Sequence, residues 1–225
     1  MEDGNHMNKL NVLYEDNHII VVEKLPNILS QADNTGDKDL LTMVKEYIKE
    51  KYNKPGNVYL GLVHRLDRPV GGIMVFARTS KAASRLSEEI RSHKFKKTYL
   101  AIVNGIIKKD SDRFVDKLER ISNGNTIVSG NGKESILEYK VLDRNYEQNK
   151  TLVEIKLETG RHHQIRVQFA SRGYPLAGDQ RYGSMDKTQI ALYAYKLEFV
   201  HPTTKENMYF EKFPDKKDYW TLFTL

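Results

Sequence analysis

Hydrophobic and polar positions alternate with a period of two in many short stretches of the chain. Such alternation is typical of strands that bury one face. The stretches 137–142 and 152–157 both show it, and we expect them to pair as a hairpin. Other β-rich stretches predict strands at 11–14, 18–23, 58–66, 73–77, 98–103, 190–200 and 208–213, with shorter strand-like pieces between 114 and 139.

Three stretches repeat their apolar residues at helical spacing instead. The first covers 39–52, and Asp37 is its expected N-cap. The second begins at Thr79 or Ser80, which both suit a cap, and the third covers 162–172. Many strands and three helices, without strict alternation of strand and helix, predict an α+β fold with a mixed or mostly antiparallel sheet.

No linker, internal repeat or low-complexity tract divides the 225 residues, so we expect a flexible N-terminal tail at 1–10 and one domain at 11–225. The longest apolar runs have four to six residues, far short of the roughly 20 that a membrane-spanning helix needs. The polar N-terminal stretch predicts no secretory signal. Without cysteine the chain forms no disulfide or thiolate metal site, which favours a cytoplasmic protein, and we expect a monomer.

The net charge of +6 and the sequence pI of about 9.2 suit a polyanionic partner without identifying one. Arg161, Arg166, Arg172 and Arg181 recur in a segment rich in glycine, histidine and aromatic residues. Arginines in such surroundings are typical of phosphate or carboxylate recognition. A solvated surface explains the lysine cluster around His93 equally well.

A first group of chemically important residues surrounds Asp67. An apolar stretch leads to this carboxylate, and a turn with one proline and two glycines follows it at 69–72. Desolvation favours the protonated acid, so Asp67 stays ionised only beside a cation. An ionised, partly dry carboxylate can act as a nucleophile or a base. Two simpler interpretations stay open, a turn-capping Asp67 and a structural, buried His64.

A second group lies at 159–183, where two arginines and two histidines follow a predicted strand. This electropositive start of a predicted helix suits phosphate or carboxylate. Ile165 and Phe169 define the apolar face of that helix, and Arg166 falls near the edge of the face. An arginine there can reach a partly buried acid, which makes it a candidate partner for Asp67.

Five motifs occur in order between about residues 13 and 213, nearly the whole chain. They are His64-Arg65-Leu66-Asp67-Arg68 with Gly72 and Ala77-Arg78; Lys97-Thr98-Tyr99-Leu100-Ala101 with Gly105; Thr159-Gly160-Arg161 with His163-Gln164-Ile165-Arg166; Pro175 with Gly178-Asp179 and Tyr182-Gly183; and Leu192-Tyr193-Ala194 with His201-Pro202. Five motifs in register are a specific signal, and with them the chain resembles the pseudouridine synthases of the RluA family.

The resemblance implies an enzyme that isomerises uridine to pseudouridine in structured ribosomal or transfer RNA. It implies an α+β domain with a long mixed sheet and a central cleft, and neither cofactor nor metal. Asp67 is the implied catalytic aspartate, Tyr99 stacks on the flipped uracil, and Arg166 pairs with Asp67. The implied substrate-binding residues are Arg65, His64, Arg161, Leu192 and Gln164.

Three departures from the family pattern bear on substrate preference more than on chemistry. Val70-Gly71-Gly72 stands where the family usually has Thr-Ser-Gly, Gln168 replaces a common histidine, and Lys24-Leu25-Pro26 replaces a Lys-Pro pair. Because only about ten residues precede the first predicted strand, we expect no N-terminal S4 domain.

Two other functions stay open. The altered turn after Asp67 is compatible with a non-catalytic RNA-binding or folding factor. His64, His162 and His163 raise the alternative of a metal-dependent nuclease. Adjacent histidines on a helix cannot easily share one ion, and no carboxylate is suitably spaced, so we expect no metal.

Overall fold

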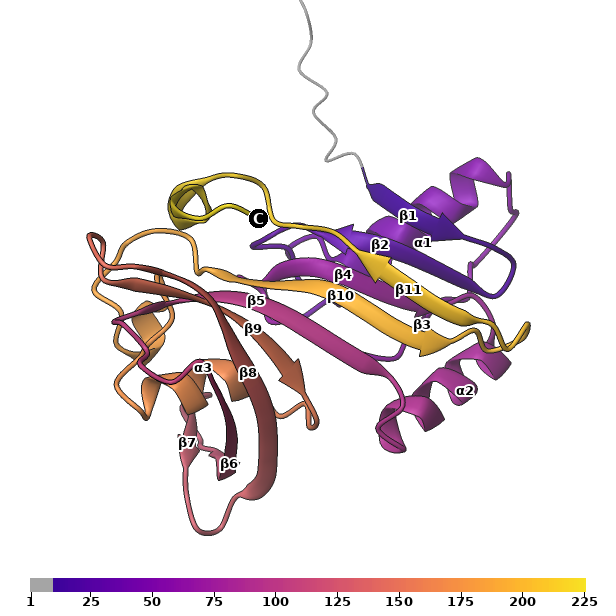
Figure 1. The fold of residues 1–225 in the computed structure, drawn as a ribbon. Helices are drawn as coiled ribbons and strands as arrows, with labels where there is room; N and C mark the ends of the chain where they lie inside the picture. Colours follow the sequence, from indigo (N-terminus) through magenta and orange to yellow (C-terminus); the bar gives the residue numbers. More distant parts are fainter. Residues whose placement is uncertain (1–9) are drawn as a thin grey trace, which may run out of the picture.

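The described residues contain eleven strands, which form one curved sheet (Figure 1). The computed structural model describes residues 10–225, so the expected tail at 1–10 lies almost entirely outside the described residues. The strands are β1 (Asn11–Glu15), β2 (Ile19–Lys24), β3 (Gly61–Leu62), β4 (Gly71–Ala77), β5 (Lys96–Asn104), β6 (Ser111–Arg120), β7 (Thr126–Val128), β8 (Lys133–Asn145), β9 (Lys150–Leu157), β10 (Leu192–Val200) and β11 (Asn207–Glu211). Their order is β1-β2-β4-β10-β5-β9-β8-β6-β7, with β11 beside β10 and β3 beside β4.

Antiparallel pairing dominates this sheet. Among the described strands only β4 and β10 run parallel, with Tyr193 opposite Gly71 and Ala194 opposite Gly72. The expected hairpin is present as β8 and β9. The predicted α+β fold with a mixed, mostly antiparallel sheet is confirmed.

The helices are α1 (Leu40–Lys51), α2 (Ser80–Arg91) and α3 (Gln164–Ala170), with short 3₁₀ helices η1 (Gln180–Tyr182) and η2 (Asp218–Leu222). Thr79 caps α2 with its side chain, as expected. The expected cap of α1 is wrong, because Asp39 and not Asp37 accepts the N–H of Thr42, at 3.0 Å. Asp37 lies outside the helix and pairs with Arg68 instead.

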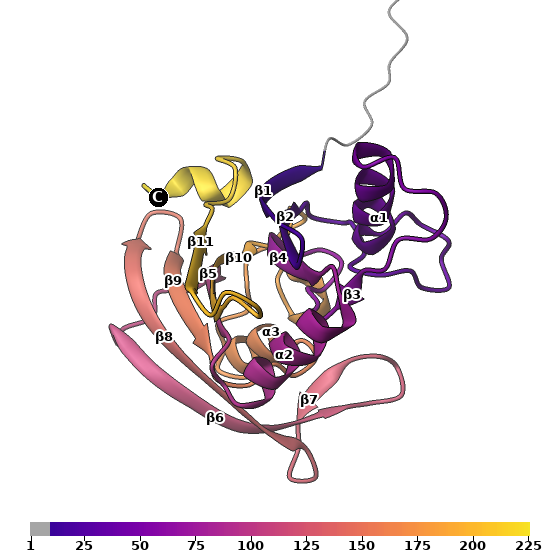
Figure 2. The ribbon, with the colours of Figure 1, turned by 90° about the vertical axis from the view of Figure 1, so that its right-hand side faces the viewer.

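The two faces of the sheet bury different elements, because successive strand residues point to opposite sides. In β5, Tyr99 and Ala101 belong to the core that includes α1 and α3, whereas Leu100 and Ile102 pack with η2. Helix α2 contributes to a third cluster, with alternate residues of β2 and β4. Figure 2 shows the β8–β6 end of the sheet curving around α3. Tyr99 therefore faces the same side as α3.

Two of the predicted elements that are shorter than expected lie beside the site described below. Of the predicted strand at 58–66 only Gly61–Leu62 forms a strand, and the backbone of Leu66 bonds to the hydroxyl of Ser30 instead of to a neighbouring strand. The third helix begins at Gln164 because the preceding residue, His163, has a left-handed backbone with φ 53° and ψ 22°. Asp67 is thus presented by a loop between β3 and β4 rather than by the end of a strand.

Candidate active site

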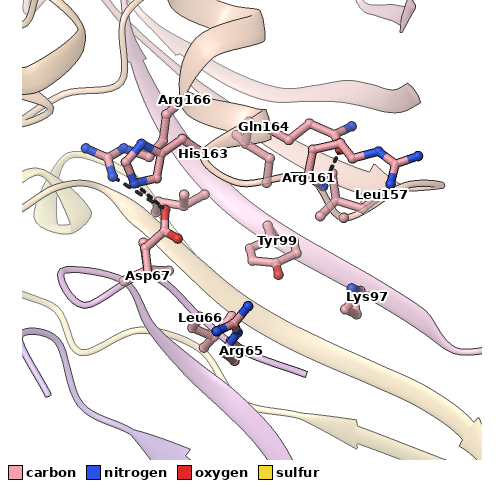
Figure 3. Close-up of a pocket in the computed structure, with 14 residues that line it drawn as sticks. Arg65, Leu66, Asp67, Lys97, Tyr99, Leu157, Arg161, His163, Gln164 and Arg166 are labelled. Carbon is pink, nitrogen blue, oxygen red and sulfur yellow. Dashed lines mark hydrogen bonds and ion pairs between the residues drawn. The ribbon is translucent and has the colours of Figure 1, made fainter. Parts of the chain in front are cut away.

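A pocket of about 80 Å³ lies between β5, the loop before β4 and the start of α3 (Figure 3). It shares several residues with a groove of about 1410 Å³. Charged side chains (Asp67, Lys97 and Arg166) and apolar ones (Leu66 and Leu192) together form its walls. The pocket suits one small flat group of a larger molecule, and the groove suits the rest of that molecule.

Buried donors fix the backbone around Asp67. The hydroxyl of Ser30 donates to the carbonyl oxygen of Leu66 at 2.8 Å and accepts the N–H of Leu66 at 3.1 Å. The N–H of Val70 donates to the carbonyl oxygen of Asp67 at 2.9 Å. None of these bonds uses the carboxylate, so the backbone is held while the side chain stays available.

A buried lysine binds the same loop. Lys24 is fully buried, and its ammonium donates to the carbonyl oxygens of Ile28 at 2.5 Å and Arg68 at 3.0 Å. Burial lowers the pKa of Lys24 to about 7, although the nearby Asp67 carboxylate opposes that shift. In the sequence, Lys24 stands out only through its place in an altered motif.

The carboxylate of Asp67 is partly exposed and is held through one oxygen. Its side chain is 27% exposed, and Arg166 Nη1 lies 3.4 Å from Oδ2. His163 Nε2 lies 3.7 Å from the same oxygen. Within residues 10–225, no hydrogen bond or ion pair reaches Oδ1, which lies on the side of Tyr99 in Figure 3.

Arg166 is oriented by a second carboxylate, Asp179. Its Nε donates to Asp179 Oδ2 at 2.8 Å and its Nη2 to Oδ1 at 2.7 Å, and both residues are buried. This two-point contact leaves Nη1 for Asp67. Burial alone would lower the pKa of Arg166, but the bond to Asp179 and the charge of Asp67 raise it. Asp179 belongs to one of the five motifs, but the sequence predicted no individual role for it.

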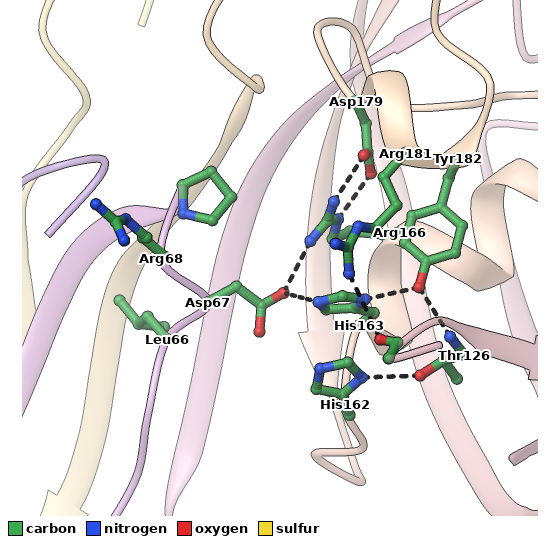
Figure 4. A network of polar contacts seen from close by, with 12 residues as sticks. Leu66, Asp67, Arg68, Thr126, His162, His163, Arg166, Asp179, Arg181 and Tyr182 are labelled. Carbon is green, nitrogen blue, oxygen red and sulfur yellow. Dashed lines mark hydrogen bonds and ion pairs between the residues drawn. The ribbon is translucent and has the colours of Figure 1, made fainter. Parts of the chain in front are cut away.

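Two histidines before α3 extend this network (Figure 4). His163 Nδ1 lies 2.6 Å from the hydroxyl oxygen of Tyr182, which also accepts the N–H of Thr126 at 3.0 Å. His162 Nδ1 lies 2.9 Å from the hydroxyl oxygen of Thr126, and the two imidazole rings stack with centroids 3.6 Å apart. Burial, and then the positive charge of Arg166, lower the pKa of His163 to about 2, so its imidazole is neutral.

Tyr99 and Lys97 point to the same face of β5, because they are two residues apart. Tyr99 is 6% exposed and lines the pocket. Burial, followed by the charge of Asp67, raises the pKa of its hydroxyl, so the phenol stays neutral. Lys97 also lines the pocket, and burial lowers its pKa. Lys97 is a further charged residue of the pocket to which sequence analysis gave no individual role.

Four of the residues expected to bind substrate line the pocket: Arg65, Arg161, Gln164 and Leu192. The amide of Gln164 is already engaged, because Oε1 accepts the N–H of Arg161 at 3.0 Å and Nε2 donates to the carbonyl oxygen of Ile136 at 3.1 Å. The guanidinium of Arg161 reaches the carbonyl oxygen of Glu134 from an exposed position. Gln164 therefore shapes the turn that presents Arg161.

His64 lies beside the larger groove rather than in the pocket. It is 8% exposed, and its Nε2 accepts the N–H of Val75 at 3.0 Å. Burial and the charge of Lys97 lower its pKa to about 3, so the ring is neutral. Its Nδ1 has no hydrogen-bond partner in the described part of the chain. These contacts give His64 a structural task in joining the Asp67 loop to β4.

The unusual residues of the sequence lie in packed surroundings. Gln168 is fully buried and donates to Asp116 at 2.7 Å, so this departure belongs to the interior. A Cβ at Gly72, where φ is 139°, would lie 2.4 Å from the carbonyl oxygen of Ala194. A Cβ at Gly71 would lie 3.1 Å from the ring of Pro26. The altered turn and the displaced proline are therefore direct neighbours.

No group of three histidine, aspartate or glutamate side chains in residues 10–225 is placed to hold a metal ion. The adjacent histidines stack on each other instead of converging on one point. No helix of the same range is long and apolar enough to cross a membrane.

A sequence profile described as RNA pseudouridylate synthase matches residues 18–171, more than half of the chain. The chain belongs to this family. The resemblance drawn from the five motifs is thereby confirmed, and the protein is an RNA pseudouridine synthase, a class of isomerase.

Similar bacterial pseudouridine synthases cover most of the chain. An uncharacterized RNA pseudouridine synthase of Aquifex aeolicus is 36% identical over 216 residues, with 90% of this chain and 68% of that protein covered. Ribosomal large subunit pseudouridine synthase D of Xanthomonas campestris is 34% identical over 215 residues, with 88% and 63% covered. The chain thus spans about two thirds of the length of these curated relatives.

Solved structures share the fold of this pseudouridine synthase. Human RNA Pseudouridylate Synthase Domain Containing 4 superposes with a TM-score of 0.77 at 20% identity, covering 94% of this chain and 90% of that one. Human RNA Pseudouridylate Synthase Domain Containing 1 gives a TM-score of 0.73 at 24% identity, with 96% and 87% covered. At these identities the likeness establishes the fold.

Proposed function

We propose that this synthase isomerises a uridine in ribosomal RNA, with Asp67 as the catalytic carboxylate and the target base flipped into the pocket. The observation that carries the proposal is the setting of Asp67, a partly exposed carboxylate in a pocket, bound at Oδ2 by a buried arginine. Relatives named as ribosomal large subunit pseudouridine synthases make that RNA the first substrate to test, and transfer RNA is the alternative.

The isomerisation breaks the C1′–N1 bond of uridine, turns the uracil and forms a C1′–C5 bond. C5 loses a proton and N1 gains one, so atoms balance without a co-reactant. The uracil leaves its stack at a cost of a few kcal/mol, less in a loop than in a duplex. Stacking on Tyr99, worth about 1–3 kcal/mol, offsets part of this cost.

The carboxylate of Asp67 acts in its ionised form. It can attack C1′, add to C6 of the uracil or remove a ribose proton, and each route needs the negative charge. Arg166 supplies the countercharge at Oδ2, while Oδ1 remains accessible to the bound nucleotide. A neutral Tyr99 stacks on the base without adding a second negative charge beside Asp67.

Positive side chains at the pocket are suited to the RNA backbone. Arg65, Lys97 and Arg161 line the pocket, and all three also line the larger groove. Phosphates held by such residues release counterions, so RNA affinity should fall steeply as salt rises. These contacts would place the target nucleotide without reading its sequence.

The deciding experiment compares wild-type protein with Asp67→Asn. Ribosomal RNA lacking modification is incubated with each protein, and pseudouridine is mapped by mass spectrometry. We expect wild-type protein to convert a uridine and Asp67→Asn to convert none while still binding RNA. The control is Asp110→Asn, which removes an exposed carboxylate paired with Arg144, and it should retain activity.

Other outcomes would favour the competing functions. Full activity of Asp67→Asn would refute the assigned carboxylate. RNA binding without conversion by wild-type protein, with ribosomal and transfer RNA both tested, would favour a non-catalytic RNA-binding factor. Shortened RNA, and its suppression by a chelator, would favour a nuclease.

A further inference from the structure

A second residue contacts the carboxylate of Asp67. We propose that His163, held as the Nε2–H tautomer by Tyr182, is a positioning residue that fixes Oδ2 of Asp67 and so turns Oδ1 towards the bound nucleotide. This inference rests on the proposed catalytic role of Asp67. It concerns a neutral side chain rather than the charged partner Arg166.

The hydrogen bonds at Tyr182 determine the tautomer. The hydroxyl oxygen of Tyr182 accepts the N–H of Thr126 at 3.0 Å, and its own hydrogen needs an acceptor. Nδ1 of His163 lies 2.6 Å from this hydroxyl oxygen, a short contact that suits it as the acceptor. A neutral imidazole that accepts at Nδ1 carries its proton at Nε2. Nε2 is the atom 3.7 Å from Oδ2 of Asp67.

The protonation states of both groups agree with this arrangement. Burial raises the pKa of the Tyr182 hydroxyl, so the hydroxyl keeps the hydrogen that it donates. Burial and Arg166 lower the pKa of His163 to about 2, so at neutral pH one of its two ring nitrogens is free to accept a hydrogen bond. His163 therefore presents an N–H dipole to Asp67 and adds no second full charge.

The backbone and the neighbouring ring hold His163 in place. Its φ of 53° lies in the left-handed region, which is uncommon for residues other than glycine. His162 stacks on the imidazole and is tied to Thr126 through its own Nδ1. Strained backbone at a residue that faces the reacting group is typical of functional sites.

Two donors at Oδ2 define the direction of the carboxylate. Arg166 Nη1 and His163 Nε2 both approach Oδ2, whereas no described residue bonds to Oδ1 (Figure 4). A single contact with Arg166 at 3.4 Å would leave the carboxylate able to rotate about its last bond. The 3.7 Å separation from His163 is long for a hydrogen bond, and such contacts commonly tighten when substrate closes the site.

The tautomer can be measured without any substrate. Protein with ¹⁵N-labelled histidine is examined by NMR, where the chemical shifts of the two ring nitrogens distinguish both tautomers from the cation. His163→Gln and His162→Gln assign the two signals. We expect His163 of the full chain to be neutral at pH 7 with its proton on Nε2. A proton on Nδ1, or a cationic ring, would overturn the proposal.

Two replacements separate the two nitrogens of His163. Asparagine places its amide near Nδ1 and tolerates the left-handed backbone, so His163→Asn keeps the Tyr182 side and loses the Asp67 side. Glutamine places its amide near Nε2. We expect His163→Asn to lower kcat about tenfold with little change in KM, since hydrogen bonds to charged groups have effects of this size. His163→Gln should recover part of that loss.

Tyr182→Phe tests the same tautomer from its other side, because it removes the hydroxyl that donates to Nδ1. It should lower kcat and give a mixture of tautomers in the NMR spectrum. His18→Gln is the matched control, at a histidine that packs on His201 away from the pocket, and it should leave kcat unchanged.

The outcomes distinguish this inference from the proposed function. If wild-type protein makes no pseudouridine in any RNA tested, the proposed function fails while the tautomer result still stands. If wild-type protein is active and His163→Asn keeps its kcat, the positioning role is refuted. An equal loss in His163→Asn and His163→Gln, together with lowered stability in both, would also refute it, because a purely structural role predicts that result.

Discussion

The two walls of the pocket hold their functional groups in opposite ways. On the Asp67 wall, Ser30 and Lys24 bind backbone carbonyl oxygens, and the carboxylate itself is 27% exposed. On the α3 wall, side chains bind one another, and Arg166 and Asp179 are both buried. One wall therefore fixes its backbone, and the other fixes its charges.

This difference follows from what each wall has to do. A carboxylate that meets a substrate needs one uncommitted oxygen, so its position has to be secured through the chain that carries it. A countercharge acts best when it is already oriented, because no energy is then spent on turning it during the reaction. The structure separates these requirements between two segments that are about 100 residues apart in sequence.

Breaking the charge network of the α3 wall should have the largest effect. Arg166→Met leaves Asp179 buried without its partner, which should lower the free energy of unfolding by about 3–5 kcal/mol. Activity should be lost as well, because Asp67 loses its countercharge. Urea unfolding and pseudouridine formation measure the two effects.

A double variant separates these two effects. In Arg166→Met/Asp179→Leu no buried charge remains unpaired, so we expect stability to recover largely while activity stays absent. Recovery of activity in the double variant would show that Asp67 works without Arg166. Arg172→Met is the control, since its partner Asp116 lies nearer the surface and the pair contributes less.

Loosening the backbone of the Asp67 wall should have a smaller effect. Ser30→Ala leaves the N–H and carbonyl oxygen of Leu66 without their buried partner, at about 1–3 kcal/mol of stability. We expect kcat to fall too, because the loop that presents Asp67 gains freedom. Urea unfolding and steady-state kinetics measure this, with Ser92→Ala, an exposed hydroxyl at the end of α2, as control. Lost stability with unchanged kcat would show that this backbone contact does not serve the chemistry.

The same division explains what the sequence allowed us to predict. Strands such as β8 and β9 carry a local alternation of polar and apolar residues, so their pairing was predictable from the chain alone. The Asp67 loop was taken for the end of a strand, because its apolar residues pack into the core without joining a ladder. Apolar content signals burial, but not the backbone partner.

The side-chain contacts of the α3 wall were less accessible to sequence analysis. The motif around Arg166 suggested a partner for Asp67, but nothing in its spacing showed that Asp179 would hold two of the guanidinium nitrogens. The left-handed backbone at His163 likewise had no clear signal, since no glycine stands there. Contacts of this kind depend on the folded geometry of distant segments.

The smallest expected effect is on the pH dependence of stability, and it compares two buried histidines, His64 on the Asp67 wall and His163 on the α3 wall. His64 has a folded pKa of about 3, below the value of about 6.5 in the unfolded chain. As pH falls from 6.5 to 5.5 the unfolded state binds a proton that the folded state does not, so stability is lost, by about 1 kcal/mol per histidine. In His64→Gln the amide oxygen can still accept the N–H of Val75, so between pH 6.5 and 5.5 this variant should lose about 1 kcal/mol less stability than wild-type protein. His163→Gln should behave alike, because the pKa of His163 is lowered in the same direction. Only His163→Gln should also alter kcat, because His64 contacts β4 and not Asp67. An equal change of kcat in both variants would mean that His64 also serves the reaction. The two walls would then be less separate than their contacts indicate.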